Sequence, residues 1–125
     1  MLYLASPYSH PDPAVSSHRF DEACRVAAAL LSLGINVFSP IAHSHPMVKY
    51  GLPTDWEFWS QLDRDFIGRC DLLVVLTLPD WQASKGVAAE MRIANELQIP
   101  VLSLSPDLPG TDLNVIKEAL AWQCA

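Results

Sequence analysis

Residues 74–91 read V-V-L-T-L-P-D-W-Q-A-S-K-G-V-A-A-E-M, and this stretch predicts the architecture of the chain. The apolar run Leu72–Leu76 is typical of a buried strand, and a polar loop through Asp80 follows it. Ser84 is a good N-cap for a helix that continues to about residue 97, with Glu90 nearly two turns inside it. Free N–H groups at such a helix start favour an anionic or polar ligand beside the strand end.

Apolar runs alternate with amphipathic helical patterns along the rest of the chain. The other strands are predicted at residues 2–5, 35–38 and 100–104. The other helices are predicted from Pro13 to about residue 31, with Asp12 and Gly34 as caps; from a capping box of Thr54 and Glu57 to about residue 69; and from a Thr111 cap to Trp122. Residues 41–53 are expected to form a long loop.

Strands that alternate with helices of this length predict β-α-β units, right-handed crossovers and a parallel sheet. We therefore expect one α/β domain over residues 1–125, a three-layer doubly wound sandwich of the flavodoxin-like or Rossmann-like type. The expected strand order is 2-1-3-4. In that order ligands bind outside the carboxyl ends of the first and third strands, which places residues 6–9 and 77–84 at the site.

The composition limits the function. Half of the 125 residues are apolar and 18% are charged, which fits a compact globular domain. A net charge of −6 and the lack of a Lys/Arg cluster argue against a nucleic-acid partner, and no apolar run is long enough for a membrane span. The N-terminus does not resemble a signal peptide. Cys24, Cys70 and Cys124 form no C-x-x-C pair, so we expect buried free thiols and a cytoplasmic location.

Glu90 and Asp63 are the candidate catalytic residues. Glu90 shares a helix face with Val87 and Ala94, and a carboxylate at such a position is costly to bury unless it is used or paired. Asp63 lies near the boundary of the apolar stripe on the preceding helix. Two carboxylates from different helices can flank one scissile bond, one as nucleophile and one as acid–base. The alternatives are exposed ion pairs, with Arg92 or Lys85 for Glu90 and with Arg64 or Arg69 for Asp63.

His43 and His45 would face one side of an extended segment, either as metal ligands or as the wall of a pocket. No further ligand stands at a suitable spacing, so we expect no metal. The aromatic residues able to sandwich a planar ring are Tyr3, Tyr8, Trp56, Trp59 and Trp81, of which Trp56 and Trp59 are expected in the core. Phosphate-binding glycine motifs and a nucleophile elbow are absent from the sequence.

Three segments resemble the nucleoside 2-deoxyribosyltransferase superfamily, and within it the branch called domain of unknown function 1937. They are Y-L-A-S-P-Y at residues 3–8, Asp63 before Cys70-Asp71, and W-x-x-S-x-G-x-x-x-E at residues 81–90. The resemblance covers roughly residues 1–104. It implies that Glu90 attacks the anomeric carbon of a (deoxy)ribosyl N-glycoside, that Asp63 assists at the leaving base, and that Tyr3 lies by the active site.

The resemblance also implies a small-molecule partner, a nucleoside or nucleoside 5′-monophosphate. Ser84 and Gly86 favour the phosphorylated ligand, because relatives that act on free nucleosides tend to have a carboxylate where Ser84 stands. The other implied binding residues are Ser6, Pro7 and Tyr8 for sugar and phosphate, Tyr3 or Trp81 against the base, and His43 in the pocket wall. Relatives that hydrolyse nucleotides carry Ser and Arg in the first loop, where this chain has Pro7 and Ser9, with Arg19 or Arg25 as possible replacements.

The implied chemistry requires no metal or organic cofactor. A homo-oligomer is expected, because relatives complete their sites across subunit contacts. Two other functions fit the same topology: a nucleotide-sensing domain that keeps the pocket without turnover, and a phosphatase-like or flavin-binding domain.

Overall fold

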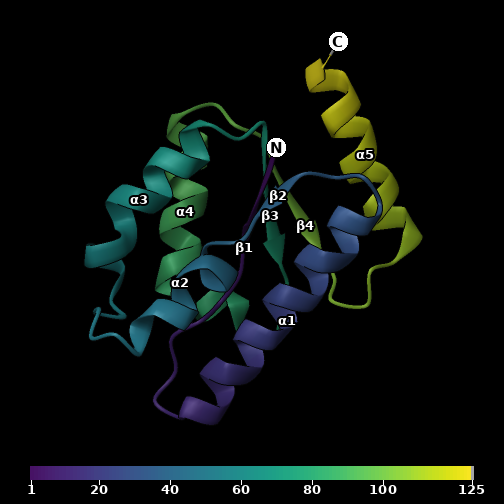
Figure 1. Cartoon of the computed structure of the whole chain (residues 1–125). Coiled ribbons are helices and arrows are strands. Elements are labelled where there is room, and N and C mark those ends of the chain that lie inside the picture. The colour runs from purple at the N-terminus through teal and green to yellow at the C-terminus, as the bar shows by residue number, and fades with distance from the viewer. Residues whose placement is uncertain (125) are drawn as a thin grey trace.

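The computed structural model describes residues 1–124, with side chains to residue 121, and contains a four-stranded parallel sheet between two layers of helices (Figure 1). The strands are β1 (Leu2–Ala5), β2 (Val37–Phe38), β3 (Leu72–Leu76) and β4 (Val101–Leu104), in the order β2-β1-β3-β4. The helices are α1 (Pro13–Ser32), α2 (Pro40–Val48), α3 (Trp56–Gly68), α4 (Lys85–Glu96) and α5 (Gly110–Cys124), with a short 3-10 helix η1 (Trp81–Ala83). The predicted doubly wound α/β fold and strand order are confirmed.

The two faces of the sheet carry separate parts of the core. Leu4 and Val74 pack with α1 and α5 on one face, whereas Tyr3 and Val75 pack with α3 and α4 on the other. In Figure 1, α1 and α5 lie on one side of the sheet, and α2, α3 and α4 on the opposite side. Burial on both faces explains why β3 reads as an unbroken apolar run.

The prediction of a long loop at residues 41–53 is wrong for residues 41–48, which belong to α2. Ser39 is the N-cap, its hydroxyl accepts the N–H of Ala42 at 3.2 Å, and Pro40 stands at the first helical position. This cap and proline repeat the signal of Asp12 and Pro13 at the start of α1. Pro46 inside the helix weakens the helical pattern in the sequence.

The predicted capping box of α3 is also wrong. The N-cap is Asp55, whose carboxylate accepts the N–H of Phe58 at 3.1 Å, so Thr54 lies before the helix. Glu57 is therefore at the second helical position, one residue too early to bond back to the cap. Asp is as good an N-cap as Thr, and the sequence offers both side by side.

The remaining differences are small. β2 is shorter than predicted, and Thr111 lies inside α5, which starts at Gly110. Cys70 is buried and Cys24 is half-buried, both as free thiols, and the side chain of Cys124 lies outside the described residues. None of the helices in residues 1–124 combines the length and apolar character of a membrane span.

Candidate active site

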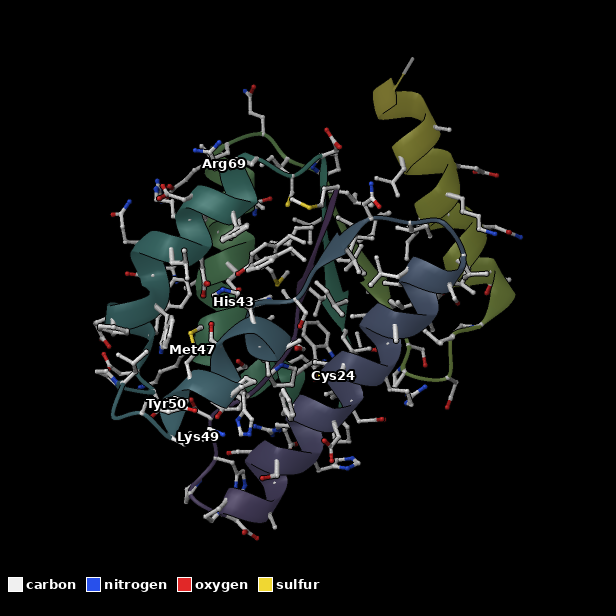
Figure 2. All side chains as sticks on the ribbon, in the orientation of Figure 1. Cys24, His43, Met47, Lys49, Tyr50 and Arg69 are labelled. Carbon is white, nitrogen blue, oxygen red and sulfur yellow. The ribbon has the colours of Figure 1, made fainter. Side chains whose placement is uncertain are left out.

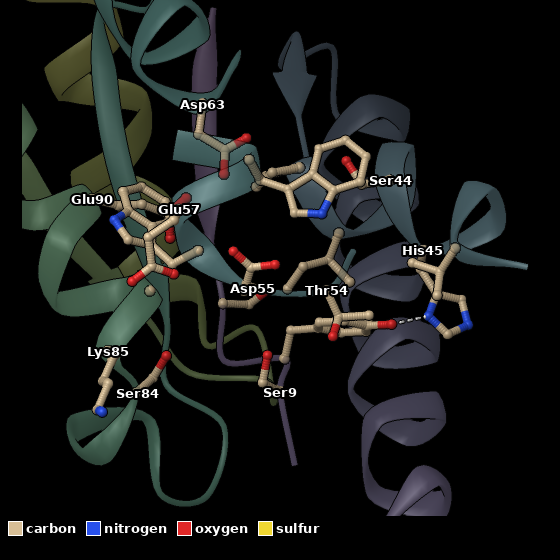
Figure 3. A pocket seen from close by; sticks show the side chains of 18 of the residues that line it. Ser9, Ser44, His45, Thr54, Asp55, Glu57, Asp63, Ser84, Lys85 and Glu90 are labelled. Carbon is tan, nitrogen blue, oxygen red and sulfur yellow. Dashed lines mark hydrogen bonds between the residues drawn. The ribbon is translucent and has the colours of Figure 1, made fainter. Parts of the chain in front are cut away.

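A cavity of about 530 Å³ opens beside the carboxyl ends of β1 and β3, at the topological switch point (Figure 3). Its volume is typical of a small-molecule site. The wall comes from four segments: the loop after β1, α2, the start and middle of α3, and the start of α4. The predicted site residues that line it are Ser6, Tyr8, Asp63, Ser84, Gly86 and Glu90.

Glu90 is buried in the wall of this cavity. The side chain is only 4% exposed, and the hydroxyl of the fully buried Tyr3 donates a hydrogen bond to its Oε2. Burial raises the pKa of Glu90 to about 8, the Tyr3 hydrogen bond opposes this rise, and the negative charge of Asp63 adds to it. The alternative of a solvated Glu90 on the helix surface is therefore wrong.

Asp63 reaches the same cavity from α3. It is 6% exposed, and its Oδ1 has no hydrogen-bond partner among the described residues. Burial raises its pKa to about 7. Arg64, one of its predicted ion-pair partners, instead binds Glu96 at 2.9 Å on the surface. A buried carboxyl oxygen without a partner is costly, which points to a ligand group that completes it.

The first loop and the start of α4 provide the neutral polar groups of the cavity. Ser6 Oγ is buried and, like Asp63 Oδ1, lacks a partner in the described part of the chain. Ser84 caps α4 by accepting the N–H of Val87 at 3.2 Å, as predicted. A Cβ atom at Gly86 would meet only Ser84 Oγ, at 3.9 Å, so the fold itself does not require glycine there.

Four residues predicted at the site lie outside the wall of this cavity. Tyr3 is fully buried behind Glu90, where its ring cannot stack on a ligand. Pro7 is buried, and Trp81 packs against the core between the sheet, α3 and α4. His43 is exposed on α2, with its ring near Phe38 and near Phe66 of α3 (Figure 2).

The predicted common orientation of His43 and His45 is wrong. In a helix, side chains two residues apart are rotated by about 200° about the helix axis, so they point to nearly opposite sides. His45 accordingly faces the cavity, where its Nδ1 lies 2.5 Å from the Tyr8 hydroxyl, while His43 turns toward Phe38. Two histidines on opposite sides of α2 cannot bind one metal ion.

Several residues of the wall were not predicted. Trp56 and Trp59, which were expected in the core, line the cavity from α3, and His45 lines it from α2. Among the described residues, Lys85 is the one Lys or Arg in the cavity wall. The start signal at Ser39 and Pro40 could have revealed α2.

The two arginines considered as replacements for a first-loop arginine lie outside the wall and have other partners. Arg19 donates to the carbonyl of Ser9 at 3.0 Å, and Arg25 pairs with Glu22 at 2.7 Å.

The chain matches the model of the domain of unknown function (DUF1937) over residues 1–105. Its structure is similar to that of the 2-deoxyribosyltransferase from the psychrotolerant bacterium Bacillus psychrosaccharolyticus. That enzyme is described as a biocatalyst for the synthesis of antiviral and antitumoral nucleosides. The TM-score is 0.60 at 26% sequence identity, over 84% of this chain and 72% of the other. No curated protein matches the chain. The chain therefore belongs to the DUF1937 family, and its fold is like that of a 2-deoxyribosyltransferase.

Proposed function

We propose that this protein cleaves or exchanges the N-glycosidic bond of a nucleoside or, preferably, a nucleoside 5′-monophosphate. The observation that carries the proposal is the pair of buried carboxyl groups, Asp63 and Glu90, that reach one cavity from two helices. The structural likeness to a 2-deoxyribosyltransferase supports a nucleoside-transferase-like function at the level of the family.

In the proposed reaction Glu90 is the nucleophile. Its Oε2 accepts the Tyr3 hydroxyl, which leaves Oε1 to attack the anomeric carbon. The N-glycosidic bond breaks, its electron pair leaves with the base, and the base takes a proton from the carboxylic acid of Asp63. The sugar is then held as an ester of Glu90. Water or a second base attacks the anomeric carbon and gives a proton to Asp63, and the ester bond breaks to restore Glu90.

The start of α4 is the proposed place for the 5′-phosphate. The first N–H groups of a helix have no acceptor within the helix and carry its positive dipole end. Ser84, Lys85 and Gly86 line the cavity there, and Lys85 adds a positive charge. The acidic residues of the wall are Asp55, Glu57, Asp63 and Glu90, so a phosphate is expected to bind only at the start of α4.

The proposal is tested by incubating the protein with a panel of nucleosides and nucleoside 5′-monophosphates and measuring released base by chromatography. Glu90→Ala is assayed beside Glu96→Ala, an exposed carboxylate on the same helix. We expect release by the wild type and by Glu96→Ala, and none by Glu90→Ala. If the wild type releases no base, with or without an acceptor base, but binds a nucleotide, the sensing function replaces the enzymatic one.

We further propose that the protein is a cytoplasmic homo-oligomer of this single domain. Light scattering at micromolar concentration measures the oligomer, and a monomeric mass would contradict that part of the proposal.

A further inference from the structure

We propose that His45 is a positioning residue that holds the ring of Tyr8 as the wall against which the planar base of the ligand stacks. The inference rests on the proposed function, because it assumes that the ligand carries a base. It assigns a role to α2, the helix that contributes His45 to the cavity.

The geometry around His45 joins three segments of the chain. The Tyr8 hydroxyl lies 2.5 Å from His45 Nδ1, and the two rings meet edge to face at 78° (dashed line in Figure 3). On α1, the ring of Phe20 stacks on the imidazole, with centroids 4.2 Å apart and planes at 27°. Phe20 of α1 thus supports one face of the imidazole, and the imidazole Nδ1 is hydrogen-bonded to the Tyr8 hydroxyl of the first loop.

The backbone of the first loop is held by a second contact, from α1. The guanidinium of Arg19, which is 9% exposed, donates to the carbonyl oxygen of Ser9 at 3.0 Å and lies 3.5 Å from that of Tyr8. Arg19 therefore fixes the main chain, and His45 fixes the end of the side chain. A ring restrained at both ends loses little conformational entropy when a ligand binds to it.

Tyr8 is the aromatic residue of the first loop that is available to a base. Tyr3 is buried behind Glu90, and Trp81 packs against the core, so neither matches the prediction that it stacks on the base. Among the described residues the phenyl and indole rings in the cavity wall belong to Tyr8, Trp56 and Trp59. Of these three rings, that of Tyr8 is tied to a helix, through His45, whereas the Trp59 indole donates to the carbonyl oxygen of Pro53 at 2.7 Å in the loop before its own helix.

The test separates base binding from catalysis. Wild type, Tyr8→Phe, His45→Ala, His45→Asn and the Tyr8→Phe/His45→Ala double variant are titrated calorimetrically with nucleosides, nucleoside 5′-monophosphates and ribose 5-phosphate. His18→Ala, an exposed histidine on α1, is the matched control. Thermal unfolding establishes that each variant is folded.

We expect Tyr8→Phe and His45→Ala each to weaken binding of base-containing ligands by about fivefold to tenfold, which is the loss of one hydrogen bond. The double variant should be no weaker than either single variant, because both remove the same interaction. Affinity for ribose 5-phosphate should not change. His45→Asn, whose amide can replace Nδ1, should recover part of the affinity. With a cleaved substrate, KM should rise and kcat should stay within about twofold.

Additive losses in the double variant, or equal losses for ribose 5-phosphate, would show that His45 only supports the fold and would overturn the inference. Unchanged affinity in His45→Ala while the wild type binds nucleosides would overturn the inference and leave the proposed function standing. If the wild type binds no nucleoside or nucleotide, both fail together.

Discussion

Replacing Glu90 by Gln is expected to stabilise the protein at neutral and alkaline pH. The pKa of Glu90 rises from 4.5 to about 8 on folding, so the folded protein holds this proton over a pH range in which the unfolded chain has released it. The free energy of unfolding therefore falls as pH rises from about 4.5 toward about 8. A Gln side chain has nearly the same shape as the protonated acid and still accepts the Tyr3 hydroxyl, but it does not titrate.

The size of the effect follows from the two pKa values. A tenfold change in an ionisation constant corresponds to about 1.4 kcal/mol. For the wild type, Glu90 alone lowers the free energy of unfolding by about 2–3 kcal/mol between pH 5 and pH 7, and by roughly 1 kcal/mol more up to pH 9. Glu90→Gln should thus be within about 1 kcal/mol of wild type at pH 5 and about 3 kcal/mol more stable at pH 7.

Urea unfolding at pH 5, 7 and 9 measures this difference. Glu118→Gln, an exposed glutamate on α5, is the control and should follow the wild type at each pH. The stability difference between Glu90→Gln and wild type must grow with pH. A difference that stays constant from pH 5 to pH 9, or one that favours the wild type at pH 9, would refute the burial argument for Glu90.

Two further predictions concern the proposed reaction. The reaction needs Glu90 ionised and Asp63 protonated, and their pKa values are about 8 and about 7. The value of kcat/KM should therefore pass through a maximum at about pH 7.5 and fall on both sides. A flat profile from pH 5 to pH 9 would contradict the roles assigned to Glu90 and Asp63. Gly86→Ala should raise the free energy of unfolding by about 0.5–1 kcal/mol, since a Cβ fits there and Ala favours a helix, yet it should raise KM if the ligand approaches this backbone. Chemical denaturation and substrate titration measure the two effects, and an unchanged KM would remove Gly86 from the site.

Local patterns gave most of the fold correctly. Asp12 with Pro13 marks the start of α1, Ser84 marks the start of α4, and the apolar run of β3 marks a strand buried on both faces. These signals work because they depend on the backbone geometry of a few neighbouring residues. Where two equivalent caps were adjacent, as at Thr54 and Asp55, the local signal did not decide, and the prediction was wrong by one residue.

The sequence determined the class of fold and the strand order, because the alternation of strands and helices follows from the spacing of apolar residues. It also indicated Asp63 and Glu90 as candidates, because helical periodicity places both near the apolar face of a helix. Only the tertiary structure decided which side chains share the cavity. It placed Tyr3 behind Glu90, moved Trp81 out of the wall and brought His45 to Tyr8 across 37 positions of the chain. Such contacts depend on how helices pack over the sheet, which no short sequence window contains.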